Sequence, residues 1–343
     1  MKYARIILTA ILCSTIIILA GCNSRPAEIE VSPDVSTERY ISSIYDEGES
    51  QNRAIVYYYK EGFLIPTTLG IKETKQPLEA VLDLLFSSWA PTGFENKLGD
   101  VGLNNFTMAG DTITIDLAKG FTDSDVGLKK AQLLFTLAEF EDVGKINILV
   151  DGDLFETVTA KPKAINNIEK VENDGSIVIK QGEVSDEEGL SFVTVYFMDK
   201  QRKNMIPVTF NSEHIEKQVE NTGVVIGPAP EQKAKAALFH LIEGPTGINQ
   251  LSGPIPKDVK LKDFYVKDGV AYVDVVKDIE LIMNLSNEAD IEKTVVESVV
   301  QTLTYVKEID KVQFLFDGNK VGSIAGHTNI SVPIRRLKWI NPV

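Results

Sequence analysis

The sequence is poor in the residues that most often carry metal, disulfide or nucleophile chemistry. It has only 2 cysteines and 3 histidines among 343 residues. No His-Glu-x-x-His run and no pair of histidines at metal-ligand spacing occurs. The Gly-x-Ser-x-Gly and Ser-x-x-Lys motifs of hydrolases and the glycine-rich loops that bind phosphate are missing as well. The sequence therefore contains no recognisable catalytic or metal-binding motif.

The chain is also short of positive charge, with 35 Lys and Arg against 49 Asp and Glu and a formal charge of −14. Repulsion from phosphate makes such a protein a poor ligand for nucleic acid, so we expect no nucleic-acid partner. One local exception is the basic cluster Arg335, Arg336 and Lys338. We expect the C-terminal residues 335–343 to form a solvated tail.

The N-terminal segment has the layout of a secretory signal. Lys2 and Arg5 precede a mainly apolar run, Ile6–Ala20, which is too short for the roughly 20 residues of a membrane span. The small residues Ala20 and Gly21 directly before Cys22 are typical of a bacterial lipobox. We predict that residues 1–21 are cleaved between Gly21 and Cys22, and that Cys22 carries diacylglycerol and further fatty acyl groups. The protein is then expected on the outer face of the cell membrane, since two acyl signals anchor firmly.

This assignment accounts for both cysteines. Cys13 lies in the discarded signal and Cys22 carries lipid, so no thiol remains for a disulfide, a zinc site or a nucleophile. Loss of Lys2 and Arg5 makes the charge more negative, −14 − 2 = −16. Residues 22–52 are polar and irregular and are predicted to be the lipidated cysteine with a flexible tether, whose r.m.s. reach is about 30 Å.

The rest of the chain contains two copies of one unit, at residues 53–160 and 190–334, with a predicted linker at 161–189. The copies share short motifs in the same order, which indicates a duplicated domain rather than a solenoid. The matched pairs are Ile55–Tyr58 with Thr194–Phe197, Ile65-Pro66 with Ile206-Pro207, Pro91-Thr92-Gly93 with Pro245-Thr246-Gly247, Ile113–Leu117 with Ala271–Val275, and Lys145–Gly152 with Lys311–Gly318.

Each copy combines runs typical of strands with amphipathic stripes typical of helices. The sequence therefore predicts an α+β fold in two tandem copies, each a small sheet packed with two helices. The predicted strands lie at 55–59, 113–117 and 146–150 in the first copy and at 193–197, 271–275 and 312–316 in the second; the predicted helices lie at 78–89, 125–140, 234–242 and 288–307.

Few side chains suggest a site. The repeated Pro91-Thr92-Gly93 and Pro245-Thr246-Gly247 are the main candidates, although a shared role in ending a helix explains them more simply. Asp116 and Asp274 occupy equivalent strand positions and could be catalytic carboxylates. The simpler interpretation is that they face solvent or support a turn. The remaining residues considered are His214, His240 and His327, expected on the surface or satisfied in a core; Tyr57–Tyr59 and Trp89, expected to pack; and Asp151–Asp153, expected to form a turn rather than a calcium loop.

This combination of motifs resembles the GerM family of sporulation and spore-germination lipoproteins. The resemblance covers nearly the whole mature chain and rests on the lipobox and on the duplicated order of strands, helices and turns. The residues that carry it are Leu19–Cys22, Ile65-Pro66, Met205–Pro207, Leu85–Gly93, Phe239–Gly247, Thr112–Leu117, Val270–Val275 and the Asp-Gly pairs at 151–152 and 317–318.

The resemblance implies modules similar to the ring-building motifs of secretion machines. It also implies roles in sporulation and germination, with partners among the envelope proteins that form the channel between mother cell and forespore. No catalytic residue is established for the family motif, so the resemblance transfers none and implies no cofactor beyond the lipid.

The leading hypothesis is therefore a membrane-anchored assembly protein without catalytic activity. A second is a hydrolase of spore-cortex peptidoglycan, or an activator of one, which would make peptidoglycan a partner. A third is a solute- or sugar-binding lipoprotein, which predicts a cleft between the two copies and a ligand-dependent rise in melting temperature.

Overall fold

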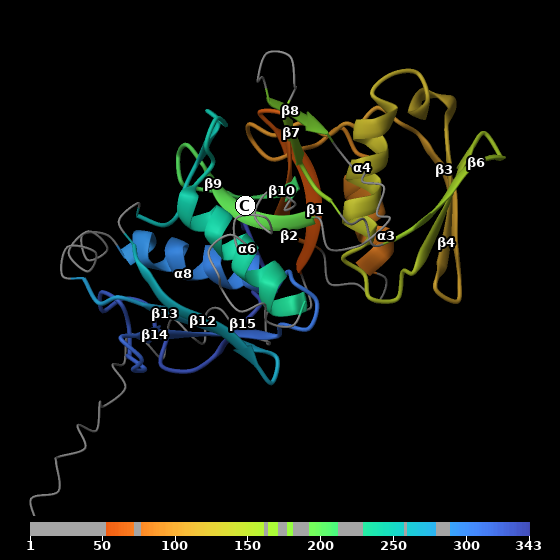
Figure 1. Ribbon diagram of the computed structural model, residues 1–343. Helices are drawn as coiled ribbons and strands as arrows, with labels where there is room; N and C mark the ends of the chain where they lie inside the picture. Colours follow the sequence, from red (N-terminus) through yellow and green to blue (C-terminus); the bar gives the residue numbers. More distant parts are fainter. Residues whose placement is uncertain are drawn as a thin grey trace, which may run out of the picture. The chain divides into compact units, whose positions relative to one another are not determined.

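The computed structural model describes residues 53–71, 77–160, 164–170, 177–180, 192–211, 229–256, 259–278 and 289–343. Both copies are present and each combines strands with helices, so the predicted α+β fold is confirmed (Figure 1). In each copy the order is a hairpin, a helix, an antiparallel strand pair, a second helix and a further strand.

Six strands and two α-helices lie in the described residues of the first copy, 53–71 and 77–160. The hairpin strands are β1 (Arg53–Lys60) and β2 (Phe63–Gly70), the helices are α3 (Pro77–Leu85) and α4 (Val126–Leu137), and the other strands are β3 (Leu103–Ala109), β4 (Thr112–Leu117), β5 (Lys145–Val150) and β6 (Asp153–Thr159).

The second copy repeats this order with additions. Its hairpin is β9 (Phe192–Asp199) and β10 (Met205–Asn211), its helices are α6 (Ala229–Glu243) and α8 (Ala289–Leu303), and its other strands are β11 (Leu251–Ser252), β12 (Leu261–Lys267), β13 (Val270–Val275), β14 (Lys311–Phe316) and β15 (Ile334–Arg335). Two strands lie in the segment predicted as the linker, β7 (Asn167–Lys170) and β8 (Ile177–Lys180).

The two four-stranded sheets have the same topology. Their orders are β3-β4-β5-β6 and β12-β13-β14-β15, and only the central pairs β4–β5 and β13–β14 run parallel. A parallel pair needs a crossover, which α4 and α8 provide. The register begins at Thr112 opposite Lys145 in one sheet and at Val270 opposite Lys311 in the other. The duplication inferred from sequence motifs thus extends to strand register.

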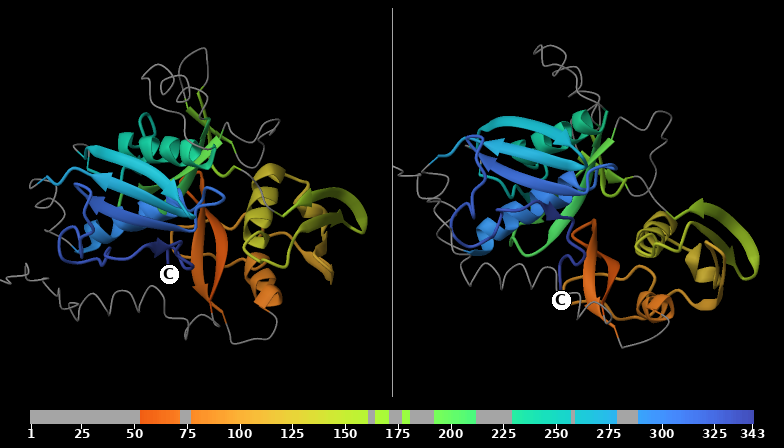
Figure 2. Two further views of the ribbon diagram at one scale, coloured as in Figure 1. Left: turned by 60° about the horizontal axis from the view of Figure 1, so that its bottom comes forward. Right: turned by 90° about the horizontal axis from the view of Figure 1, so that it is seen from below.

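The core of the first copy lies between its sheet and its helices. Ile113, Ile115 and Leu117 are buried on one face of β4, and Val81, Leu82 and Leu85 of α3 join the same apolar cluster. Both helices lie on one side of this sheet in Figures 1 and 2. The alternating pattern of β4 is what allows one face to be apolar, because successive side chains point to opposite faces.

The second helix of each copy is attached to its hairpin by an equivalent hydrogen bond. The backbone N–H of Tyr57 donates to Thr136 Oγ1 over 3.1 Å, and that of Tyr196 donates to Thr302 Oγ1 over 3.0 Å. Both threonines are buried in helices. These contacts account for a buried polar residue on each helix, since a buried donor and acceptor satisfy each other.

The hairpin of the first copy also packs against the second copy. Phe63 and Ile65 of β2 belong to the apolar cluster formed mainly by the second copy. At the ends of β1 and β9, Lys60 Nζ lies 3.0 Å from Asp199 Oδ2. Burial opposes ionisation of Asp199, but hydrogen bonds from Asn204, Lys203 and Lys60 outweigh it and lower the pKa of that carboxyl.

The copies exchange short segments that follow their last strands. Ile165, after the first copy, pairs with Thr209 of β10: the N–H of Thr209 donates to the Ile165 carbonyl over 3.0 Å. Ile340, after the second copy, pairs in the same way with Thr68 of β2, over 3.1 Å. Each copy therefore binds the C-terminal segment of the other.

The next residue in each exchanged segment is a buried asparagine that bridges the two hairpins. Asn166 accepts from the N–H of Leu64 and donates to the carbonyls of Leu64 and Pro207, over 2.7, 2.8 and 2.7 Å. Asn341 accepts from the N–H of Met205 and donates to the carbonyls of Met205 and Pro66, over 2.7, 2.8 and 2.8 Å. We call Asn166 and Asn341 the asparagine clamps. Because each is bonded to both hairpins, the clamps fix the two copies to each other.

Two expectations from the sequence are wrong here. The C-terminal residues do not form a solvated tail, because Leu337, Ile340 and Asn341 are buried and hold the two hairpins together. Trp89 does not continue the stripe of the first helix: α3 ends at Leu85, and Trp89 is 49% exposed, with its ring edge-on to that of Tyr58 at 6.2 Å.

Candidate functional site: a charged pocket between the copies

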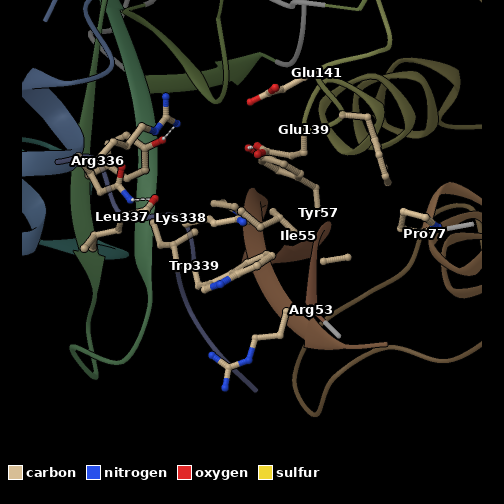
Figure 3. Close-up of a pocket in the computed structure, with 16 residues that line it drawn as sticks. Arg53, Ile55, Tyr57, Pro77, Glu139, Glu141, Arg336, Leu337, Lys338 and Trp339 are labelled. Carbon is tan, nitrogen blue, oxygen red and sulfur yellow. Dashed lines mark hydrogen bonds between the residues drawn. The ribbon is translucent and has the colours of Figure 1, made fainter. Parts of the chain in front are cut away.

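A pocket of about 580 Å³ opens where the two copies meet (Figure 3). One side is formed by β1 and by the residues that follow α4, and the other by the C-terminal segment 336–340. We call it the inter-copy pocket. Its volume is within the range of small-molecule sites. The side chains that define its chemistry are Arg53, Tyr57, Glu139, Glu141, Tyr196, Arg336, Lys338 and Trp339.

The first copy supplies the acidic side of the inter-copy pocket. Glu139 and Glu141 follow α4, and Figure 3 shows their carboxylates on the same side. Tyr57 Oη donates a hydrogen bond to Glu139 Oε1 over 2.8 Å. Solvent reaches Glu139 through the pocket, yet protein surrounds it closely enough that burial raises the pKa of its carboxyl, against the opposing effects of the Tyr57 hydrogen bond and the Arg336 charge.

The second copy supplies the basic side. The guanidinium of Arg336 donates to Tyr196 Oη over 3.4 Å and lies 5.2 Å from the ring centre of Tyr305. Lys338 Nζ lies 5.3 Å from the ring centre of Trp339. Both cations line the pocket on either side of Leu337, which is buried and lines it as well.

The backbone of this basic segment is fixed from both ends. Gln301 of α8 donates from Nε2 to the Leu337 carbonyl over 3.1 Å, and the Thr68 hydroxyl donates to the Ile340 carbonyl over 2.6 Å. The pocket therefore has a preset geometry that depends on the exchanged segment. The sequence did not reveal the pocket, because its acids and bases lie about 200 residues apart. The exchanged segments share the pair Ile-Asn at 165–166 and 340–341, but the same pair also occurs at 146–147 and 248–249.

A second exposed feature is the sheet edge of the first copy. Strand β6 is an edge strand, and its residues Leu154 and Phe155 are 65% and 43% exposed. In the second copy the strand at the corresponding edge, β15, is much shorter and pairs with β14 only at Lys311 and Val312. The loop that follows β14 packs on the second-copy core through the buried Ile330.

The repeated Pro-Thr-Gly candidates form equivalent turns. The N–H of Phe94 donates to the Pro91 carbonyl over 2.9 Å, and that of Ile248 donates to the Pro245 carbonyl over 3.1 Å. Gly93 and Gly247 have φ of 84° and 81°, which a type II turn requires at its third residue. In the first copy the turn starts six residues after α3 ends, so the motif builds a turn there rather than ending the helix. Thr92 and Thr246 are exposed, and binding through them stays a prediction.

The paired aspartates have a structural role. Asp116 Oδ1 accepts from the N–H of Gly152, and Asp274 Oδ1 accepts from the N–H of Gly318, each over 2.9 Å. They stabilise the Asp-Gly turns at the ends of β5 and β14, which matches the turn-supporting interpretation.

The two histidines that the structure describes, His240 and His327, lie in different surroundings. His240 stacks on Phe210 with ring centres 4.7 Å apart, and burial lowers its pKa to about 4. His327 donates its backbone N–H to Glu292 over 2.9 Å, whereas His214 lies outside the described residues. Within the described ranges, no group of three or more His, Cys, Asp or Glu side chains is placed to hold a metal ion. Gly21, Cys22, the signal and the tether also lie outside the described residues.

Comparison with known proteins places these features in a family. The Germane family, described as sporulation and spore germination, matches residues 50–156 and 194–322. The tandem GerMN domains of the sporulation protein GerM from Bacillus subtilis share the fold, with a TM-score of 0.60 and 19% identity over 84% of this chain and 99% of that one. The first GerMN domain of that protein alone gives a TM-score of 0.32 and 24% identity, over 42% of this chain and 97% of the domain.

A Clostridium perfringens protein assigned provisionally as a lipoprotein is also similar, with 23% identity and a TM-score of 0.29 over 42% of this chain and 86% of its own. No curated protein is similar enough to count as a match. Among the described helices, none has the length and apolar character needed to cross a membrane.

Proposed function

We propose, from the premise that this chain belongs to the Germane family of sporulation and spore germination domains, that it is a lipid-anchored assembly protein of the cell envelope without catalytic activity. In this proposal Cys22 holds the chain to the outer face of the membrane. The folded part localises or assembles the channel complex between mother cell and forespore.

Two observations together support the proposal: the copies are firmly joined to each other, and the first copy leaves the sheet edge at β6 exposed. The asparagine clamps and the exchanged segments hold two modules in one arrangement, as a scaffold requires. Strand β6 leaves backbone groups and two exposed apolar side chains, Leu154 and Phe155, at a sheet edge. An edge of this kind is suited to pairing with a strand of another protein.

The experiment is site-specific photo-crosslinking in sporulating cells. A crosslinking amino acid replaces Leu154 on β6 or, as the matched control, Val332 on the second copy, which is 53% exposed. The proposal expects adducts with envelope proteins from position 154 and none from 332. Adducts from neither position, together with a correctly placed channel complex in a deletion strain, would refute it.

One observation favours the alternative of peptidoglycan hydrolysis. Glu139 lies in a pocket with a second carboxylate, Glu141, and its pKa is raised by burial, which is what a general acid for glycoside cleavage needs. Incubation of the pure protein with spore-cortex fragments decides this alternative. Release of reducing ends that is abolished in Glu139→Gln would support a hydrolase, whereas no release from any cortex preparation would leave the assembly role.

A further inference from the structure

We propose that the inter-copy pocket binds a short peptide through its free amino and carboxyl ends. The peptide's ammonium group is placed toward Glu139 and Glu141, and its carboxylate toward Arg336 and Lys338. This proposal is independent of docking through β6, because the pocket lies on β1, the residues after α4 and the C-terminal segment.

Acidic and basic side chains are separated inside the pocket. The carboxylates of Glu139 and Glu141 come from the first copy, and the cations of Arg336 and Lys338 come from the second (Figure 3). A further cation, Arg53 of β1, lines the pocket at the end away from the two glutamates. Neither acid forms an ion pair with either base among the described residues. The two sides therefore remain available to a ligand that carries both charges.

A ligand of one charge fits the pocket less well. A simple anion would meet Arg336 and Lys338 but would be repelled by the two glutamates, and a simple cation would face the reverse. A zwitterion compensates both sides at once, and charge-assisted hydrogen bonds are the strongest contacts that such groups can make. An amino acid or peptide with free ends is the simplest zwitterion in a cell envelope.

Size and lining favour a short peptide over a single amino acid. The volume of about 580 Å³ exceeds what one small residue fills. Ile55, Tyr57 and Trp339 also line the pocket and provide apolar and aromatic surface for the middle of a peptide. The hydrogen bond from Tyr57 occupies Oε1 of Glu139 and leaves Oε2 for a ligand donor.

The basic segment is also positioned in advance. Gln301 and Thr68 hold the carbonyls of Leu337 and Ile340, so Arg336 and Lys338 do not need to be ordered by the ligand. A site whose backbone is fixed before binding loses less conformational entropy on binding.

The test measures binding of trialanine to the full chain in detergent. The sequence has 2 tryptophans, and Trp89→Phe leaves Trp339 in the pocket as the single fluorescent reporter. Trialanine should change Trp339 fluorescence with saturation. N-acetyl-trialanine, which lacks the ammonium, and trialanine amide, which lacks the carboxylate, should each bind about tenfold to a hundredfold more weakly, as expected for loss of one charge-assisted contact.

Two variants with matched controls connect this binding to the pocket. Glu139→Gln and Arg336→Gln should each weaken trialanine about tenfold or more. Glu243→Gln and Lys267→Gln, at exposed positions on α6 and β12, should bind as the parent does. Melting temperatures close to the parent show that the variants remain folded. Equal binding of the capped peptides, equal effects of the control variants, or no saturable signal up to about 10 mM trialanine would each overturn the proposal.

Discussion

Replacement of Asn341 by alanine should be among the most damaging single changes in this protein. The side chain makes three buried hydrogen bonds, to the N–H and carbonyl of Met205 and to the carbonyl of Pro66. At about 1 kcal/mol for each, their loss costs about 3 kcal/mol. Asn341 also has φ of 50°, and alanine in this left-handed conformation costs about 1 kcal/mol more.

The expected loss for Asn341→Ala is therefore about 4 kcal/mol, a large part of the 5–15 kcal/mol that stabilises a typical domain. Asn341→Gly is the informative companion, because glycine removes the same hydrogen bonds without the backbone penalty and should cost about 3 kcal/mol. Asn166→Ala should match Asn341→Ala, since Asn166 makes the equivalent contacts and has φ of 49°. Asn249→Ala, at an exposed position, is the control and should stay within about 0.5 kcal/mol.

Urea unfolding measured with single-tryptophan variants tests both the size and the reach of the effect. Trp89 reports on the first copy and Trp339 on the exchanged C-terminal segment. If the clamps make the copies cooperative, Asn341→Ala lowers both midpoints together. A loss below about 1 kcal/mol, or a shift of the Trp339 midpoint alone, would refute the reasoning.

Three further predictions follow from individual contacts. Burial lowers the pKa of His240 to about 4, against 6.5 in the unfolded chain, so unfolding takes up a proton as the pH falls below 6.5. The parent should therefore lose about 2 kcal/mol of folding stability between pH 7 and pH 5, and His240→Phe should not show this loss, as measured by urea unfolding at both pH values. Gly93→Ala should cost about 1 kcal/mol, because φ is 84° at this position, although a Cβ there would have open space. Gly127 lies inside α4 and also has open space for a Cβ, so Gly127→Ala should stabilise the protein by about 0.5 kcal/mol. Equal shifts in melting temperature for the two variants would contradict this. Tyr57→Phe should raise the pKa of Glu139 further, since the Tyr57 hydrogen bond lowers it; NMR titration of the glutamate carboxyl carbons checks the direction.

Much of each copy could be predicted from the sequence because the information is local. Strands β4 and β13 alternate apolar and polar residues, and α8 begins and ends close to the predicted range of 288–307. Helix α3 was predicted too long, because Trp89 fits the helical period although the chain leaves the helix after Leu85. Pro91 and Gly93 follow the last helical residue, Leu85, by six and eight residues, so neither they nor the periodicity places the end of this helix.

The inter-copy pocket could not be predicted, because its two sides meet only through the exchange of segments. The basic cluster at 335–338 has the composition of a solvated tail, and the acids after α4 look like an ordinary helix end. What identifies both segments is the pair Ile-Asn, at 165–166 and 340–341, in which the isoleucine pairs with a strand and the asparagine bridges two hairpins. Two residues are too short a repeat to be noticed before their contacts are known.

The two copies retain the same topology but present different surfaces, and this asymmetry bears on how the protein works. In the second copy, Glu292 accepts hydrogen bonds from the N–H groups of Ile324 and His327 over 2.8 and 2.9 Å, which fixes the loop after β14. Gln313 donates to the carbonyl of Ile330 in the same loop over 3.0 Å. The first copy instead ends in β6, a seven-residue edge strand with exposed Leu154. Strand β6 and its counterpart β15 therefore present different surfaces at the same edge of the two sheets. A partner paired with β6 would sit at a fixed position relative to the pocket, because the clamps join the copies.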